Sequence, residues 1–186
     1  ERVGREALAE ALHVLVGQHG RGREDRHLAA RVLFVPRVAS SEMPALFRAA
    51  DAVLDTFPFG GGVTSLQAMA AGVAPVTLPE PGAWSGQLTL SMYHQLAVAV
   101  GGDGAKHSSF RVSGPRDSSV VENTLGLFEA CVARDAVDYA QKAVRLAKDA
   151  VLRQQLRAVI REHAQGALFN DKRAAREWAR FLYGLI

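Results

Sequence analysis

The fold predicted from this sequence is organised around residues 55–72, which read DTFPFGGGVTSLQAMAAG. The three residues before them, 52–54, form a short apolar run that is typical of a buried strand. Three consecutive glycines remove side chains where the backbone turns tightly or where another group approaches closely. We expect a helix after the glycines, closed by Gly72 in the left-handed conformation, and then a strand at 73–79. The predicted order is therefore strand, glycine turn, helix, strand.

The start of the predicted helix has the features of an anion-binding site. Thr64 and Ser65 carry hydroxyls that can cap backbone N–H groups. The N–H groups of a first helical turn and the positive end of the helix dipole point the same way. A tight strand-to-helix connection also uses glycine, however, so the spacing alone leaves both interpretations open.

The neighbouring elements predict an α/β fold, a Rossmann-like parallel sheet with helices on both faces. An apolar run at 31–35 and the two strands already named alternate with helical patterns, one at about 42–50 and one after the glycines. Strands and helices in this order favour parallel strands. Ligands bind such sheets at the carboxyl ends of strands, so the loops at 36–41 and 56–62 are expected to share one ligand-binding edge.

The remainder of the chain is predicted to be mainly helical. Apolar residues at helical spacing indicate helices at 1–19 and 85–97, and C-terminal helices from Asp135 onward, the last at about 172–183. Residues 101–119 are rich in glycine and serine, and we interpret them as a loop insertion.

Composition limits the classes to which this chain can belong. It has 186 residues, of which 48% are hydrophobic and 22% charged, as is typical of one globular domain. A net charge of +3 without a basic stripe argues against nucleic acid as a partner, and the apolar runs are far shorter than a membrane span. The lone cysteine, Cys131, is expected to be buried. No spacing of His or Cys indicates a metal site.

The chain begins at Glu1, inside a predicted helix and without a signal-peptide pattern. We interpret it as a segment of a longer protein or as an incomplete gene model. We expect an intracellular protein, cytoplasmic or nuclear.

Residues 34–36 and 49–79, with stretches within 132–147 and at 168–170, resemble the carboxyl-terminal catalytic region of the O-GlcNAc transferase and SPINDLY family. The resemblance implies a GT-B fold in which residues 1–186 form the second, nucleotide-sugar-binding half. It implies a glycosyltransferase that moves GlcNAc or a related sugar from a donor such as UDP-GlcNAc to Ser or Thr hydroxyls of proteins. Helix dipole and N–H groups, without a metal, would stabilise the diphosphate leaving group. The implied partners are the first GT-B half, upstream tetratricopeptide repeats and a protein acceptor.

The resemblance also implies binding residues in two loops, and it names no catalytic residue. Gln67 stands where the family usually has a carboxylate that bonds the ribose, and an amide there lacks charge assistance. Pro36, Arg37 and Val38 match the loop that meets the nucleobase through main-chain groups. The residues of the turn that holds the diphosphate are Thr56, Gly60, Gly61, Gly62, Val63, Thr64 and Ser65.

The sequence departs from the family pattern in its basic residues. Ser40, Met43 and Leu46 stand where O-GlcNAc transferases have a Lys, a His and an Arg. This departure keeps a second interpretation open, in which the domain is catalytically degenerate and acts as a binding or scaffold module. A third interpretation is an unrelated α/β domain whose glycines only form a tight turn.

Overall fold

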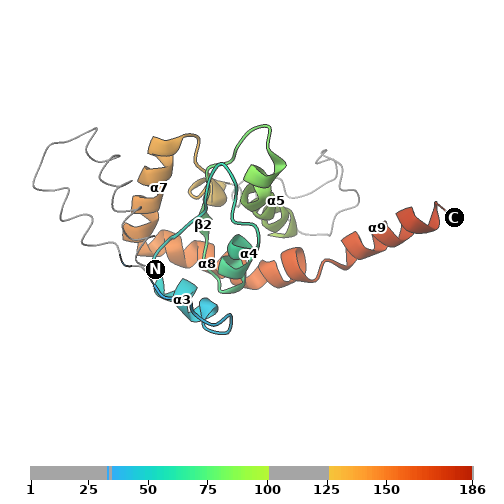
Figure 1. The fold of residues 1–186 in the computed structure, drawn as a ribbon, viewed down its shortest axis with the longest axis horizontal. Helices are drawn as coiled ribbons and strands as arrows, with labels where there is room; N and C mark the ends of the chain where they lie inside the picture. The colour runs from blue at the N-terminus through green and yellow to red at the C-terminus, as the bar shows by residue number, and fades with distance from the viewer. Residues whose placement is uncertain (1–32, 34, 101–125, 186) are drawn as a thin grey trace, which may run out of the picture. The chain divides into compact units, whose positions relative to one another are not determined.

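The computed structural model describes residues 33, 35–100 and 126–185, and it divides into two compact units, residues 1–40 and 41–186. The second unit is a mixed α/β structure, mostly helical, with a small parallel sheet (Figure 1). Its elements are α3 (Met43–Ala49), β1 (Val53–Leu54), α4 (Val63–Ala70), β2 (Pro75–Val76), the 3-10 helix η1 (Trp84–Gln87), α5 (Leu88–Val100), α7 (Ala136–Lys148), α8 (Ala150–Ala164), the π-helix η2 (Gln165–Phe169) and α9 (Lys172–Tyr183).

The predicted order of strand, glycine turn, helix and strand is confirmed. Strands β1 and β2 pair in parallel, with Val53 opposite Pro75 and Leu54 opposite Val76. The sheet continues past β2 through a parallel bridge between Thr77 and Val132. Because the strands are parallel, their carboxyl ends lie at one edge of the sheet, and the chain leaves β1 at this edge to form the glycine turn.

The strand predicted at 31–35 is not found in the residues that the structure describes there. Leu33 and Val35 adopt no regular structure and are exposed, so they do not form a buried strand. Apolar composition alone predicted this strand, but a buried strand also needs a pairing partner and a covering layer. The helix predicted at 1–19 and the insertion at 101–119 lie outside the described residues.

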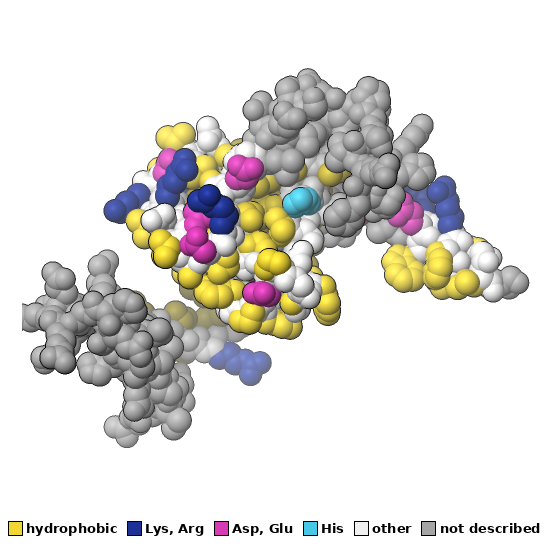
Figure 2. Space-filling model, turned by 90° about the horizontal axis from the view of Figure 1, so that it is seen from above, with side chains coloured by type: hydrophobic (Ala, Val, Ile, Leu, Met, Phe, Trp, Pro, Cys, Tyr) yellow, Lys and Arg dark blue, Asp and Glu magenta, His cyan; other side chains and the backbone are white. Residues whose placement is uncertain are grey.

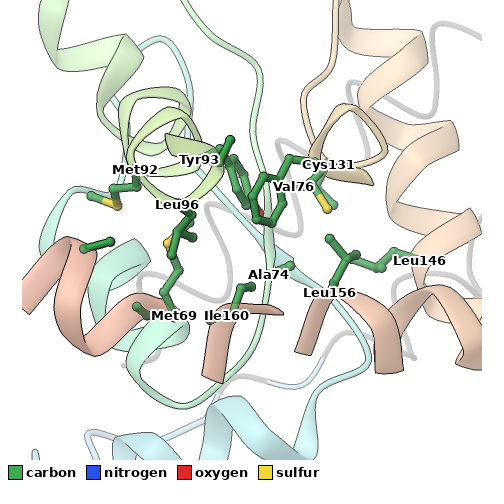
Figure 3. Packing of buried hydrophobic residues seen from close by; sticks show 14 of the residues in the cluster. Met69, Ala74, Val76, Met92, Tyr93, Leu96, Cys131, Leu146, Leu156 and Ile160 are labelled. Carbon is green, nitrogen blue, oxygen red and sulfur yellow. The ribbon is translucent and has the colours of Figure 1, made fainter. Parts of the chain in front are cut away.

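The core of the second unit lies where α4, α5 and α8 meet β2 (Figure 3). Met69, Val76, Leu96, Leu156 and Ile160 are almost completely buried there. The Tyr93 hydroxyl joins α5 to the sheet by donating to the Pro75 carbonyl at 2.5 Å. A smaller cluster of Phe47, Ala68, Ala71 and Val73 packs α3 against α4.

The helix ends follow local sequence rules. Gly72 has φ +77° just after α4, as predicted for a left-handed C-terminal position. A Cβ at Gly72 would also meet the Arg161 side chain, 2.8 Å from its Nε, but this exposed side chain can move, so the conformation is the main reason for glycine. Asp135 caps α7 by accepting from the N–H groups of Val137 and Asp138, and Asp149 caps α8. The predicted C-terminal helices are thus confirmed.

No helix within the described residues is both long enough and apolar enough to cross a lipid bilayer.

Cys131 provides a test of the packing through the pH dependence of stability. Burial raises the pKa of its thiol from the ordinary 9.0 to about 12. The thiol therefore holds its proton more tightly in the folded state than in the unfolded state. Below both pKa values this group has no effect on the free energy of unfolding, which falls as the pH rises from the unfolded pKa to the folded pKa. Above about pH 9, we expect urea denaturation to show a loss of roughly 1 kcal/mol per pH unit from this group.

The matched variant is Cys131→Ala, which lacks the titrating thiol. Tyr139 also has a raised pKa and is present in both proteins. The pKa of Tyr93 is raised by burial and then by the Cys131 thiol, so the comparison reports on Cys131 together with its effect on Tyr93. The pH slope should be smaller in the variant, and equal slopes would show that Cys131 is not shielded from water.

Candidate functional site

Asp55 directly follows β1, and its carboxylate is buried at 4% exposure. One oxygen, Oδ1, accepts from the Gly61 N–H at 2.5 Å and from the Ser65 hydroxyl at 3.3 Å. The other, Oδ2, accepts from the Thr77 hydroxyl at 2.9 Å. A buried carboxylate needs such donors in place of water. Asp55 therefore joins the end of β1 to the glycine turn, to α4 and to the end of β2.

Close packing and backbone conformation explain why the turn contains glycines. A Cβ at Gly60 would lie 2.9 Å from the Ser85 carbonyl oxygen, and a Cβ at Gly61 would lie 2.8 Å from Asp55 Oδ1. Gly62 has φ +42°, which side chains disfavour. The close packing explains why glycine is present, so the glycines alone do not indicate a ligand.

Side chains on both flanks fix the outer part of the turn. The Thr56 hydroxyl donates to the Phe59 carbonyl at 2.7 Å, across the cis peptide bond between Phe57 and Pro58. The Tyr139 hydroxyl, from α7, donates to the Asp55 carbonyl at 2.6 Å. The Tyr139 ring also meets the Phe57 ring edge-on, with centroids 5.3 Å apart. Burial, followed by the charge of Asp55, raises the pKa of Tyr139 to about 12, so its hydroxyl stays protonated and able to donate.

The first turn of α4 presents unused hydrogen-bond donors. Gly61 and Gly62 accept from the N–H groups of Thr64 and Leu66. Within the described residues, the N–H groups of Gly62 and Val63 have no acceptor. The helix has no side-chain cap and no acidic residue in its first turn, and the Val63 side chain is 70% exposed. This arrangement can bind an anionic group.

The structure brings together the predicted residues of the glycine turn, but they do not all face outward. Thr64 and Gln67 are exposed on α4. Ser65 is 2% exposed, and its hydroxyl contacts Asp55 and Thr89 instead of the outer surface. Ser65 therefore supports the turn from inside, and its hydroxyl is not available to a ligand in this structure.

The predicted nucleobase loop lies in the unit of residues 1–40, and the glycine turn lies in the unit of residues 41–186. Pro36 and Arg37 are exposed and Val38 is half-buried, in irregular chain that belongs to the unit of residues 1–40. The site described here is accordingly built from the second unit alone.

Four residues that form this site were not predicted from the sequence: Asp55, Thr77, Thr89 and Tyr139. For Asp55, a signal was present, because a single acid followed an apolar strand and preceded the glycines. Thr77 ends the next strand in the same way. Thr89 and Tyr139 carry no local signal, since only the fold brings them to the turn.

The described part of the chain holds no group of three or more His, Cys, Asp or Glu side chains placed to bind a metal ion. Comparison with protein-family models, with curated proteins and with solved structures gives no match to this chain.

The central role of Asp55 predicts a large effect of removing its carboxylate. Asp55→Ala would leave two buried hydroxyls and the partly buried Gly61 N–H without this acceptor, so we expect the free energy of unfolding to fall by about 2–4 kcal/mol in urea denaturation.

The control is Asp51→Ala, which removes another acid close to β1. Asp51 is exposed and pairs with Arg153 at 3.2 Å. Its loss should change stability by about 1 kcal/mol or less. Similar losses in the two variants would contradict the role assigned to Asp55.

Proposed function

We propose that this chain is the nucleotide-sugar-binding half of a GT-B glycosyltransferase that resembles the O-GlcNAc transferase and SPINDLY family. The observation that carries the proposal is the pair of unused N–H groups of Gly62 and Val63. They stand at the start of α4 and at the carboxyl end of β1, where parallel α/β sheets bind ligands. A diphosphate is the ligand class that this arrangement suits best.

The proposed role of the turn is to stabilise the diphosphate as it leaves. The two N–H groups and the positive end of the α4 dipole would interact with the charge that develops on the leaving group. Thr64 is exposed beside them and Gln67 follows on the same helix, so they are the side chains proposed to contact the phosphate and the ribose. In this proposal GlcNAc or a related sugar passes from a donor such as UDP-GlcNAc to a protein Ser or Thr hydroxyl. The first GT-B half would supply the acceptor side.

A second candidate, a catalytically degenerate binding module, is favoured by the charge distribution. Between Arg48 and Lys106 the sequence contains neither Lys nor Arg. The phosphates would therefore meet backbone dipoles without a cationic side chain from this segment. Charge-assisted contacts are about twice as strong as neutral ones, so donor binding here would be weaker than in an enzyme with the basic residues.

Calorimetric titration of the intact protein with UDP, and separately with GDP, tests the proposal. Val63→Glu is the informative variant. Val63 is exposed, and an acid in the first turn of a helix is compatible with folding, but its carboxylate would repel a diphosphate. We expect tenfold or greater weakening of nucleotide binding, about 1.4 kcal/mol.

Val63→Gln is the matched control, with a similar shape and no charge, and it should bind like the wild type. If neither nucleotide binds, the proposed function is wrong. If nucleotide binds but the intact protein neither hydrolyses UDP-GlcNAc nor transfers its sugar, the degenerate binding module is the better description.

The C-terminal helix α9 gives a second prediction of the same proposal. Trp178, Phe181 and Leu182 are each more than half exposed, with the Trp178 and Phe181 ring centroids 5.9 Å apart. Figure 2 shows hydrophobic side chains gathered along this helix. We propose that this apolar face packs on the first GT-B half. Replacing the three residues by Ala should speed proteolytic separation of the two halves in the intact protein while leaving nucleotide affinity nearly unchanged.

Arg176→Ala serves as the control for α9, because this Arg bonds only within its own helix among the described residues. It should alter neither proteolysis nor affinity. A large loss of nucleotide affinity in the triple variant would count against this placement of α9.

A further inference from the structure

We propose that Thr89 of α5 is a positioning residue that acts through Ser65 and Asp55 on the N–H groups of the glycine turn. The inference rests on the proposed nucleotide binding and deepens it. It assigns to α5, a helix with no predicted part in the site, control over the geometry that meets the diphosphate.

A directed chain of hydrogen bonds connects Thr89 to the turn. The Thr89 hydroxyl donates to Ser65 Oγ at 2.9 Å, and the Ser65 hydroxyl donates to Asp55 Oδ1 at 3.3 Å. The direction is fixed, because a carboxylate only accepts and each hydroxyl has one proton to give. The same oxygen of Asp55 accepts from the Gly61 N–H. The next two N–H groups along the chain are the unused donors of Gly62 and Val63.

The chain is shielded from water along its whole length. Thr89, Ser65 and Asp55 are 1%, 2% and 4% exposed. Water therefore cannot easily replace a missing link, and a buried hydrogen bond is stronger than an exposed one. Loss of the Thr89 hydroxyl would leave Ser65 Oγ with an empty acceptor position and free it to rotate away from Asp55.

The first turn of α4 is joined to α5 by the Thr89–Ser65 hydrogen bond. Ser65 lies in the first turn of α4, so holding its side chain fixes the rotation of that helix about its axis. Leu88, the first residue of α5, lies beside the turn, because its Cδ1 would be 3.3 Å from a Cβ added at Gly62. Thr77, at the end of β2, holds the other carboxylate oxygen in place. The direction in which the Gly62 and Val63 N–H groups point is thereby set from α5 as well as from the sheet.

The test compares Thr89→Val, which keeps the shape and removes the hydroxyl, with Thr89→Ser, which keeps the hydroxyl. Ile160→Val is the control for stability alone. Ile160 is fully buried on α8, and its truncation removes one methyl group without changing a polar contact. The probe is UDP or GDP, whichever binds the wild-type intact protein, and the readouts are calorimetric affinity and amide hydrogen exchange at Gly61.

We expect Thr89→Val to weaken nucleotide binding by about tenfold, the equivalent of one buried hydrogen bond, and to speed exchange at Gly61. Thr89→Ser should restore both values, and Ile160→Val should change neither beyond its effect on global stability. Wild-type affinity in Thr89→Val would overturn the inference while leaving the proposed function intact. If the wild type binds neither nucleotide, the proposed function fails, and exchange at Gly61 then decides the positioning role: faster exchange in Thr89→Val than in Ile160→Val supports it, and equal exchange overturns it.

Discussion

The need to solvate one buried carboxylate underlies the structure around the glycine turn. Asp55 follows β1 and is buried, so donors from Gly61, Ser65 and Thr77 take the place of water around its carboxylate. These donors come from the turn, the following helix and the end of the next strand. Hydrogen bonding to one carboxylate therefore holds these three segments together. The closeness of this packing also explains the glycine at position 61, since a side chain there would meet the carboxylate.

This construction has a consequence for recognition. The turn offers backbone dipoles and no cationic side chain, and the sequence around it contains no Lys or Arg from residue 49 to residue 105. A point charge attracts an anion over a range of positions, whereas an N–H group acts only when distance and angle are both favourable. A site of this kind depends on accurate placement of the main chain, which is what the buried network beneath it provides.

The sequence predicted those parts of the fold that depend on neighbouring residues. The strand, turn, helix and strand from β1 to β2, the left-handed Gly72 and the C-terminal helices each have local signatures. The strand predicted at 31–35 is not found at Leu33 and Val35, the two residues described there, because an apolar run does not show whether a pairing partner exists. Ser65 shows that local sequence does not determine which way a side chain points. A hydroxyl at a helix start indicated contact with a ligand, but its partners Asp55 and Thr89 lie 10 and 24 residues away and turn it inward.

The hydrogen bond from Tyr139 to the Asp55 carbonyl has implications for how the molecule reaches its native state. It joins residues 84 positions apart in the chain, and the Phe57 ring packs on the same tyrosine. Contacts so distant in sequence form only after the entropy of closing a long loop has been overcome. During synthesis, Asp55 emerges 84 residues before Tyr139, so the turn cannot gain this support until α7 has been made. The support from α7 therefore becomes available to the turn only after the residues that bond to Asp55 from Gly61, Ser65 and Thr77 have been made.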